Sequence, residues 1–103
     1  MNKNCFCNEI DNVITDLDNM YRILRDRIID DLRNEMVINE LEYIDKLMDY
    51  IKDSKNCKEN EYLEKLLVLQ RCFYYLQIYS NLYNDFIFNR IMFIIQMVYN
   101  NLR

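Results

Sequence analysis

The stretch IDNVITDLDNMYRILRDRIIDDL, residues 10–32, decides the fold that we expect for this chain. Its apolar side chains recur every third or fourth residue, which is the period of one face of an α-helix. Opposite charges four residues apart lie on the other face, where such pairs support a solvent-exposed helix. The pattern predicts a long amphipathic helix over roughly residues 8–35. The apolar stripe comprises Ile10, Ile14, Leu17, Tyr21, Leu24, Ile28 and Leu32, and the charge pairs are Asp18 with Arg22, Arg22 with Asp26, and Arg27 with Asp31.

The next segment has the same period and begins with a capping signal. Asn39 can accept hydrogen bonds from the first helical turn, and Glu42 stands in the capping-box position three residues later. We therefore expect a second helix from Asn39 to about Lys52. The polar stretch 53–60 that follows predicts a loop.

Two more helices are expected in the rest of the chain. Asn60 can cap a third helix, which should end in a turn near residues 81–85, before a fourth helix over roughly 86–101. A single long helix that bends near 81–85 is the alternative, because no residue there forces a stop. The residues expected in the core are Leu17, Leu24, Ile28, Leu66, Leu69, Phe73, Ile91, Ile94 and Val98.

The composition agrees with a compact helical domain. The chain has 103 residues with no Gly and no Pro, so it lacks the strongest helix breakers. Length and periodicity together predict a single all-α domain over residues 1–103. We expect a small antiparallel bundle of three to four helices, with dimerisation as one way to complete its core. Residues 1–8 are expected to form a flexible, cysteine-containing N-terminal tail.

The distribution of charge limits the kinds of partner. The net charge is −4 and no cationic run is present, which argues against binding to nucleic acid or to an anionic membrane. The densest apolar stretch, residues 86–99, is too short and too polar for a membrane span. Residues 1–65 hold 16 acidic and 10 basic side chains, whereas residues 66–103 hold one acidic and three basic ones. Of residues 66–102, 25 of 37 are apolar, counting Tyr and Cys, so the second half of the chain is the apolar half.

The four cysteines allow disulfides, metal ligation or neither. In an up-down-up-down bundle the N-terminus lies near the loop between the second and third helices, so Cys5 or Cys7 could form a disulfide with Cys57. Cys72 lies about 18 Å into the third helix at about 1.5 Å per residue, so we expect it in the core. An unpaired N-terminal tail is the competing interpretation for Cys5 and Cys7.

No pattern for catalysis or cofactor binding is present in the sequence. The absence of His removes the commonest general base and metal ligand, and the absence of Gly removes phosphate-binding loops. Several carboxylate pairs fall on charged helical faces, where a solvated role is the simpler interpretation than acid–base or metal chemistry. We therefore expect no cofactor, no metal and no enzymatic activity. The carboxylate pairs are Asp16 with Asp18, Asp30 with Asp31, and Asp45 with Asp49.

The third and fourth helices carry more apolar residues than one helical face can bury. Consecutive residues step about 100° around the helix axis, so Tyr74, Tyr75, Ile78 and Tyr79 cannot all point inward. Exposed Tyr and Phe are enriched at the centres of protein interfaces. The exposed interface residues are expected to include Tyr75, Tyr79, Tyr83, Phe88 and Ile95.

These observations favour a non-enzymatic protein–protein interaction module that binds another protein, or itself as a homodimer, through its last two helices. The abundance of residues with AT-rich codons indicates an AT-rich source, and thus a viral, phage or parasite modulator that binds a host protein. One alternative is a secreted, disulfide-bonded four-helix ligand read by a receptor, and another is a Cys-based metal or redox protein. Residues 1–8 lack the apolar segment of a signal peptide, which favours the cytosol, including that of a host cell, over secretion.

Overall fold

Four α-helices make up the part of the chain that the structure describes, which covers residues 3–31, 35–53, 60–81 and 84–102. Within those residues this computed structural model contains no strand, so the all-α prediction is confirmed. The predicted loop over 53–60 lies almost entirely outside the described residues. The helices are α1 (Lys3–Asp31), α2 (Glu35–Asp53), α3 (Asn60–Ser80) and α4 (Phe86–Leu102).

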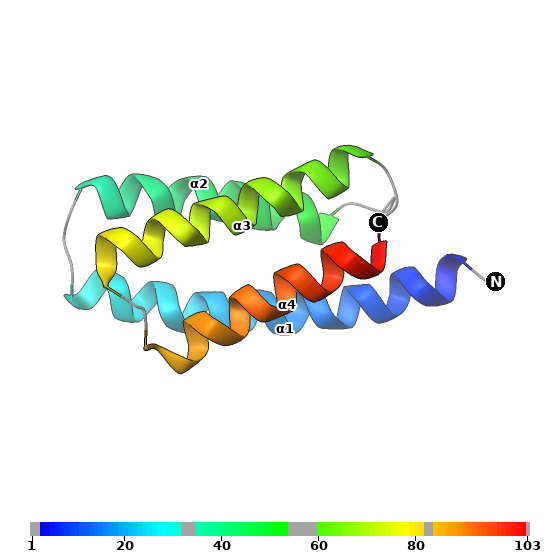
Figure 1. Ribbon diagram of the computed structural model, residues 1–103, viewed down its shortest axis with the longest axis horizontal. Helices are drawn as coiled ribbons and strands as arrows, with labels where there is room; N and C mark the ends of the chain where they lie inside the picture. The colour runs from blue at the N-terminus through cyan, green and yellow to red at the C-terminus, as the bar shows by residue number, and fades with distance from the viewer. Residues whose placement is uncertain (1–2, 32–34, 54–59, 82–83, 103) are drawn as a thin grey trace.

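The helices form an up-down-up-down bundle in which each runs antiparallel to the one before it (Figure 1). α1 packs against α2 and α4, and α3 packs against the same two helices. α1 and α3 therefore lie on one diagonal of the bundle, and α2 and α4 lie on the other. The molecule is elongated, with extents of 46 × 23 × 18 Å, so each helix presents a long outer face.

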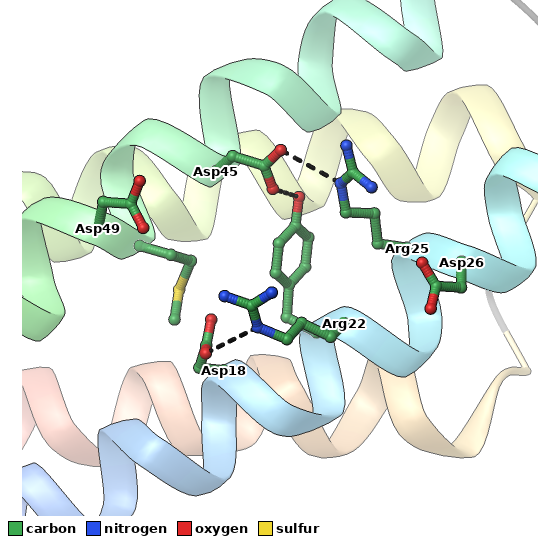
Figure 2. A pocket seen from close by; sticks show the side chains of 8 residues that line it. Asp18, Arg22, Arg25, Asp26, Asp45 and Asp49 are labelled. Carbon is green, nitrogen blue, oxygen red and sulfur yellow. Dashed lines mark hydrogen bonds and ion pairs between the residues drawn. The ribbon is translucent and has the colours of Figure 1, made fainter.

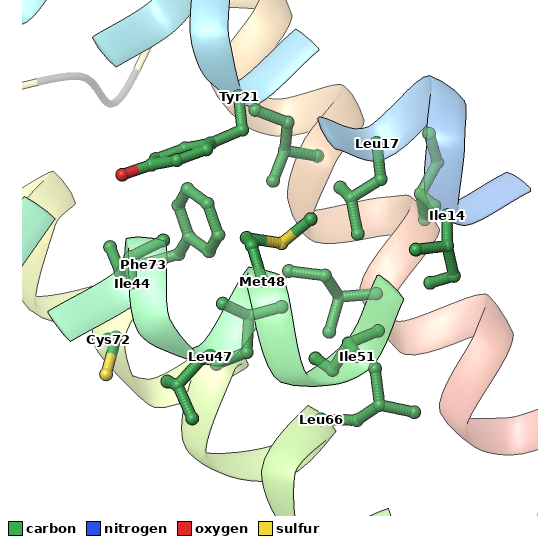
Figure 3. Close-up of a cluster of buried hydrophobic side chains, with 14 of the residues drawn as sticks. Ile14, Leu17, Tyr21, Ile44, Leu47, Met48, Ile51, Leu66, Cys72 and Phe73 are labelled. Atoms are coloured by element: carbon green, nitrogen blue, oxygen red, sulfur yellow. The ribbon is translucent and has the colours of Figure 1, made fainter. Parts of the chain in front are cut away.

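The centre of the bundle is a continuous apolar core drawn from all four helices (Figure 3). Leu17, Leu24 and Phe73 have no exposed surface, and the other residues predicted for the core are buried as well. The Tyr21 and Phe73 rings meet edge-on with centroids 5.7 Å apart, and the Phe73 and Phe88 rings meet in the same manner at 6.2 Å. Edge-on contacts of this kind add to the energy of burial, so three helices interlock through aromatic side chains.

The first helix starts earlier than predicted. α1 begins at Lys3 rather than near residue 8, so the tail predicted over residues 1–8 is helical from residue 3 onward, and Cys5 and Cys7 lie within the helix. α1 is described to Asp31, and the predicted limit at residue 35 cannot be compared with it because residues 32–34 lie outside the described residues. The physical reason for the longer start is the absence of Gly and Pro, because nothing before Ile10 ends the helical hydrogen-bond ladder.

The second helix also starts earlier than the capping signal indicated. α2 begins at Glu35, and Asn39 lies exposed within its second turn instead of capping it. Val37 is completely buried and precedes Leu41 and Ile44 at helical spacing, so the apolar stripe already begins before Asn39. Burial of that stripe outweighs a single capping residue, and Glu35 places a negative charge in the first turn, where the helix dipole favours it.

The break between α3 and α4 lies where it was predicted and has identifiable causes. Asn81 adopts a left-handed backbone conformation with φ of 56°, which terminates α3 in the manner of a helix C-cap. Asp85 is the N-cap of α4, because its Oδ1 accepts a hydrogen bond of 2.9 Å from the backbone N–H of Phe88. Asp85 also forms an ion pair with Arg27 of α1. The alternative of one bent helix is therefore wrong.

Truncation at the centre of the core should be costly. Leu17→Ala should lower the free energy of unfolding by about 2–5 kcal/mol, because the lost methyl groups leave a cavity at a completely buried position. Ile23→Ala on the same helix, where the side chain is 57% exposed, should cost less than about 0.5 kcal/mol. Urea denaturation followed by far-ultraviolet circular dichroism measures both, and similar losses at the two positions would contradict the placement of α1.

The two roles of Asp85 should be separable. Asp85→Ala removes both the cap and the ion pair, and should cost about 1–2 kcal/mol of unfolding free energy. Asp85→Asn keeps an oxygen that can cap α4 but removes the charge that faces Arg27, so its cost should stay below about 1 kcal/mol. Equal losses for the two variants in urea denaturation would show that the cap contributes nothing.

Candidate functional site

Exposed large apolar side chains gather on α3. Isolated exposed apolar residues are normal on a protein surface, but a contiguous group indicates an interaction site. Five of the eleven such residues in the described part of the chain lie on α3. The eleven are Ile23, Met36, Ile38, Tyr43, Leu67, Tyr74, Tyr75, Ile78, Tyr79, Phe86 and Phe93.

The outer side of α3 is an apolar stripe with one charge near its middle. Leu67, Arg71, Tyr74 and Ile78 follow one another at intervals of four, three and four residues, which places them in one line along the helix. Tyr74 is 58% exposed and Ile78 is 54% exposed, although the remainder of each side chain packs on the protein. We refer to Leu67, Arg71, Tyr74, Tyr75, Ile78 and Tyr79 as the aromatic face.

The aromatic face contains a groove and, beside it, a stacked pair of tyrosine rings. An open groove of about 480 Å³ is lined by Leu67, Gln70, Arg71, Tyr74 and Tyr75. Beside it the Tyr75 ring stacks against the ring of Tyr79, with centroids 6.5 Å apart and planes inclined by 23°. A groove with aromatic walls and a guanidinium group is the kind of surface into which another protein's side chains insert.

The predicted interface residues divide into three groups. Tyr75 and Tyr79 are exposed, as expected, at 47% and 41%. Phe88 and Ile95 are only 1% exposed, so the prediction that they would be exposed is wrong. Both side chains belong to the buried stripe of α4, where they stand three residues before and four residues after Ile91. Tyr83 lies outside the described residues.

Four members of the aromatic face were missing from the predicted interface residues. Leu67, Arg71, Tyr74 and Ile78 lie about half a turn from the buried residues of α3. Their regular spacing opposite the core stripe was present in the sequence and could have identified them. The core stripe of α3 comprises Tyr62, Leu66, Leu69, Cys72, Phe73, Leu76 and Ser80.

The outer side of α4 is more polar than predicted. Phe86 and Phe93 are exposed at 80% and 57%, and the Arg90 guanidinium lies 5.7 Å from the centre of the Phe93 ring. The remaining exposed positions of α4 are all polar: Asn89, Arg90, Gln96, Asn100 and Asn101. The apolar surplus that the sequence assigned to both helices is therefore concentrated on α3.

A second candidate site is a polar cleft of about 370 Å³ between α1 and α2 (Figure 2). The Tyr21 hydroxyl lies 2.6 Å from Asp45 Oδ1 and 3.0 Å from the carbonyl oxygen of Leu41, so its proton is shared between two acceptors on α2. Arg25 donates from Nε to the other oxygen of Asp45 at 3.2 Å. The cleft is lined by Asp18, Tyr21, Arg22, Arg25, Asp26, Asp45, Met48 and Asp49.

The expectation that the acidic residues of α1 are fully solvated is wrong for Asp18. This residue is buried, and its Oδ2 lies 3.0 Å from Arg22 Nε and 3.1 Å from Lys52 Nζ. The Asp18–Arg22 pair was predicted from spacing, whereas Lys52 reaches it from α2. Burial, reinforced by Asp45, raises the pKa of Tyr21 far above its usual range, so the hydroxyl keeps its proton at alkaline pH where an exposed tyrosine loses it. The cleft therefore joins α1 to α2 through paired charges.

Cys72 is buried and unpaired, as predicted for a core residue. Burial, with a smaller contribution from the Glu40 carboxylate, raises the pKa of its thiol to about 12. A thiol held in its protonated form is a poor nucleophile and metal ligand. The proposed disulfide partners Cys5, Cys7 and Cys57 have side chains outside the described residues, and among the residues that are described no three acidic or cysteine side chains are grouped as a metal site.

Comparison with known proteins gives no assignment for this site. No family model, no curated protein and no solved structure matches this chain. Across the helices that the structure describes, none combines the length and apolarity of a membrane span.

Two buried phenols and a buried thiol predict that stability falls at alkaline pH. Above the ordinary pKa values of 9.0 for Cys and 10.0 for Tyr, the unfolded chain loses protons that Cys72, Tyr21 and Tyr62 retain in the fold. The unfolded state then binds fewer protons, so the free energy of unfolding decreases as pH rises. Each such group contributes about 1.4 kcal/mol per pH unit within its window.

This pH dependence can be measured by urea denaturation between about pH 8 and 12. Tyr21→Phe should make the decline above pH 10 shallower by about 1.4 kcal/mol per pH unit, because it removes one linked proton. Ile44→Val, a buried change without a titrating group, should lower stability by a similar amount at every pH. If the free energy of unfolding decreased with pH equally in Tyr21→Phe and in the wild type, this would contradict a Tyr21 that stays protonated in the fold.

Proposed function

We propose that this chain is a protein–protein interaction module that binds its partner through the aromatic face of α3. The observation that carries the proposal is a line of large apolar side chains along one exposed helical face, with Arg71 as the only charge between Leu67 and Ile78. Contiguous apolar surface of this kind is unfavourable in water, and a bound protein removes it from solvent.

The residue types on this face are those that dominate binding energy in protein interfaces. Tyr and Arg are enriched at hot spots, because both combine a large apolar surface with hydrogen-bonding or cationic groups. Tyr74, Tyr75 and Tyr79 are between 41% and 58% exposed, so each still has apolar surface to bury. Each is also partly packed on the protein, which reduces the conformational entropy that binding must remove.

A non-catalytic role is supported by the state of the reactive groups. The raised pKa of the Cys72 thiol disfavours its nucleophilic thiolate form, and the Tyr21 hydroxyl is hydrogen-bonded to Asp45 and to the Leu41 carbonyl oxygen. Asp18 and Asp45 are paired with cations across the α1–α2 contact. A modulator of a host protein, from an AT-rich virus, phage or parasite, is the form of this function that the composition favours, and it stays a prediction.

The proposal is tested with two variants of matched exposure. Tyr74→Lys with Ile78→Lys places charge on the aromatic face, whereas Ile23→Lys places charge at a 57% exposed position on α1, the helix diagonal to α3. Association is measured in two ways: sedimentation of the purified chain, and affinity capture from the cells that produce it.

The α3 variant should lose both self-association and captured proteins, while the Ile23 variant retains whatever the wild type binds. Both variants should keep the circular dichroism of a helical protein, because all three positions are exposed. Association that survives the α3 substitutions, or a wild type that neither self-associates nor captures a protein, would contradict the proposal.

A further inference from the structure

We propose that the occupant of the aromatic face is a second copy of this chain, paired through antiparallel α3 helices about a two-fold axis that passes between residues 72 and 73. This inference rests on the proposed function, since it names the partner of the same surface. It predicts an isologous interface, in which each contact occurs twice.

Four residues of the aromatic face have a spacing that is symmetric when its direction is reversed. Leu67, Arg71, Tyr74 and Ile78 are separated by four, three and four residues, which reads the same from either end. Alternation of four and three residues is also the spacing by which two helices pack side chains along a shared seam. When two copies of α3 meet antiparallel, Leu67 lies level with Ile78 of the other copy, and Arg71 lies level with Tyr74 of the other copy.

The chemistry matches at each of these levels. Leu67 meets an aliphatic side chain, and the Arg71 guanidinium meets an aromatic ring, on whose face a cation is attracted. Arg71 forms no ion pair with any residue that the structure describes, so its charge is available to such a ring. Glu64, the next residue of the line, lies level with Asn81 of the other copy, so no two carboxylates meet.

The exposed area agrees with a weak dimer. At about 200 Å² per aromatic side chain, the exposed fractions of Tyr74, Tyr75 and Tyr79 amount to about 300 Å² per copy. Leu67, Ile78 and the stem of Arg71 bring the total for two copies toward about 1,000 Å², which is the lower end of specific interfaces. We therefore expect a reversible dimer with a dissociation constant of about 1 μM or higher.

Sedimentation velocity of single variants and of their mixture tests this pairing. Arg71→Glu places a carboxylate against Tyr74 of the other copy, and Tyr74→Lys places an ammonium group against Arg71. Each variant alone should dissociate about tenfold more readily than wild type or worse, because two symmetric contacts are lost. Mixed in equal amounts, they should associate about as well as wild type, because the introduced carboxylate of one copy then meets the introduced ammonium group of the other, while the second Arg71–Tyr74 contact is intact.

Three controls make the result decisive. Ile23→Lys should dimerise like wild type, and its mixture with Arg71→Glu should not restore full association. Circular dichroism should show each variant to be helical. If the wild type stays monomeric up to about millimolar concentration, the partner is not a second copy of the chain. In that case the proposed function still holds if the wild type captures another protein and the α3 variant does not. A wild-type dimer whose two variants do not rescue each other overturns the antiparallel pairing.

Discussion

Tyr21 connects all four helices, and the rest of the bundle depends on its position. Its ring lies across the core against Phe73 of the diagonal helix α3, and Phe73 in turn contacts Phe88 of α4. Its hydroxyl reaches the other way, to Asp45 and to the Leu41 carbonyl on α2. Because the hydroxyl is buried, loss of these acceptors would leave a polar group unpaired in the core, which is costly. The contact therefore holds α1 at one height and rotation relative to its neighbours.

The exposure of the aromatic face follows from this arrangement. Phe73 must point inward to meet Tyr21, and the helical period then turns Arg71, Tyr74 and Ile78 outward. A rotation of α3 that buried Tyr74 would remove Phe73 from the centre of the core, where it has no exposed surface. The chain thus cannot hide its surplus of apolar residues by repacking α3, and the surplus remains available for a partner.

Much of the fold could be predicted from periodicity, because burial of a stripe every three or four residues is a local property of the sequence. Leu17 and Phe73 were identified in this way, and both are completely buried. Phe88 and Ile95 were misplaced although they stand three residues before and four residues after Ile91, on the stripe that correctly placed Ile91 in the core. Asp85 fixes where α4 begins, and burial of the apolar stripe sets its inward side. Asp18 was misjudged because Lys52, which pairs with it, is distant in sequence.

Charge and apolar surface are segregated in the bundle, and this decides which faces can associate. Four carboxylates line the cleft between α1 and α2, where only two arginines line it with them. Two copies brought together through that side would oppose like charges, which weakens association at moderate ionic strength. The aromatic face of α3 carries the single charge of Arg71 amid apolar side chains, and α1 lies diagonally across the bundle from α3. Contact through α3 therefore buries apolar surface while it leaves the acidic cleft in solvent, where its charges remain hydrated and screened.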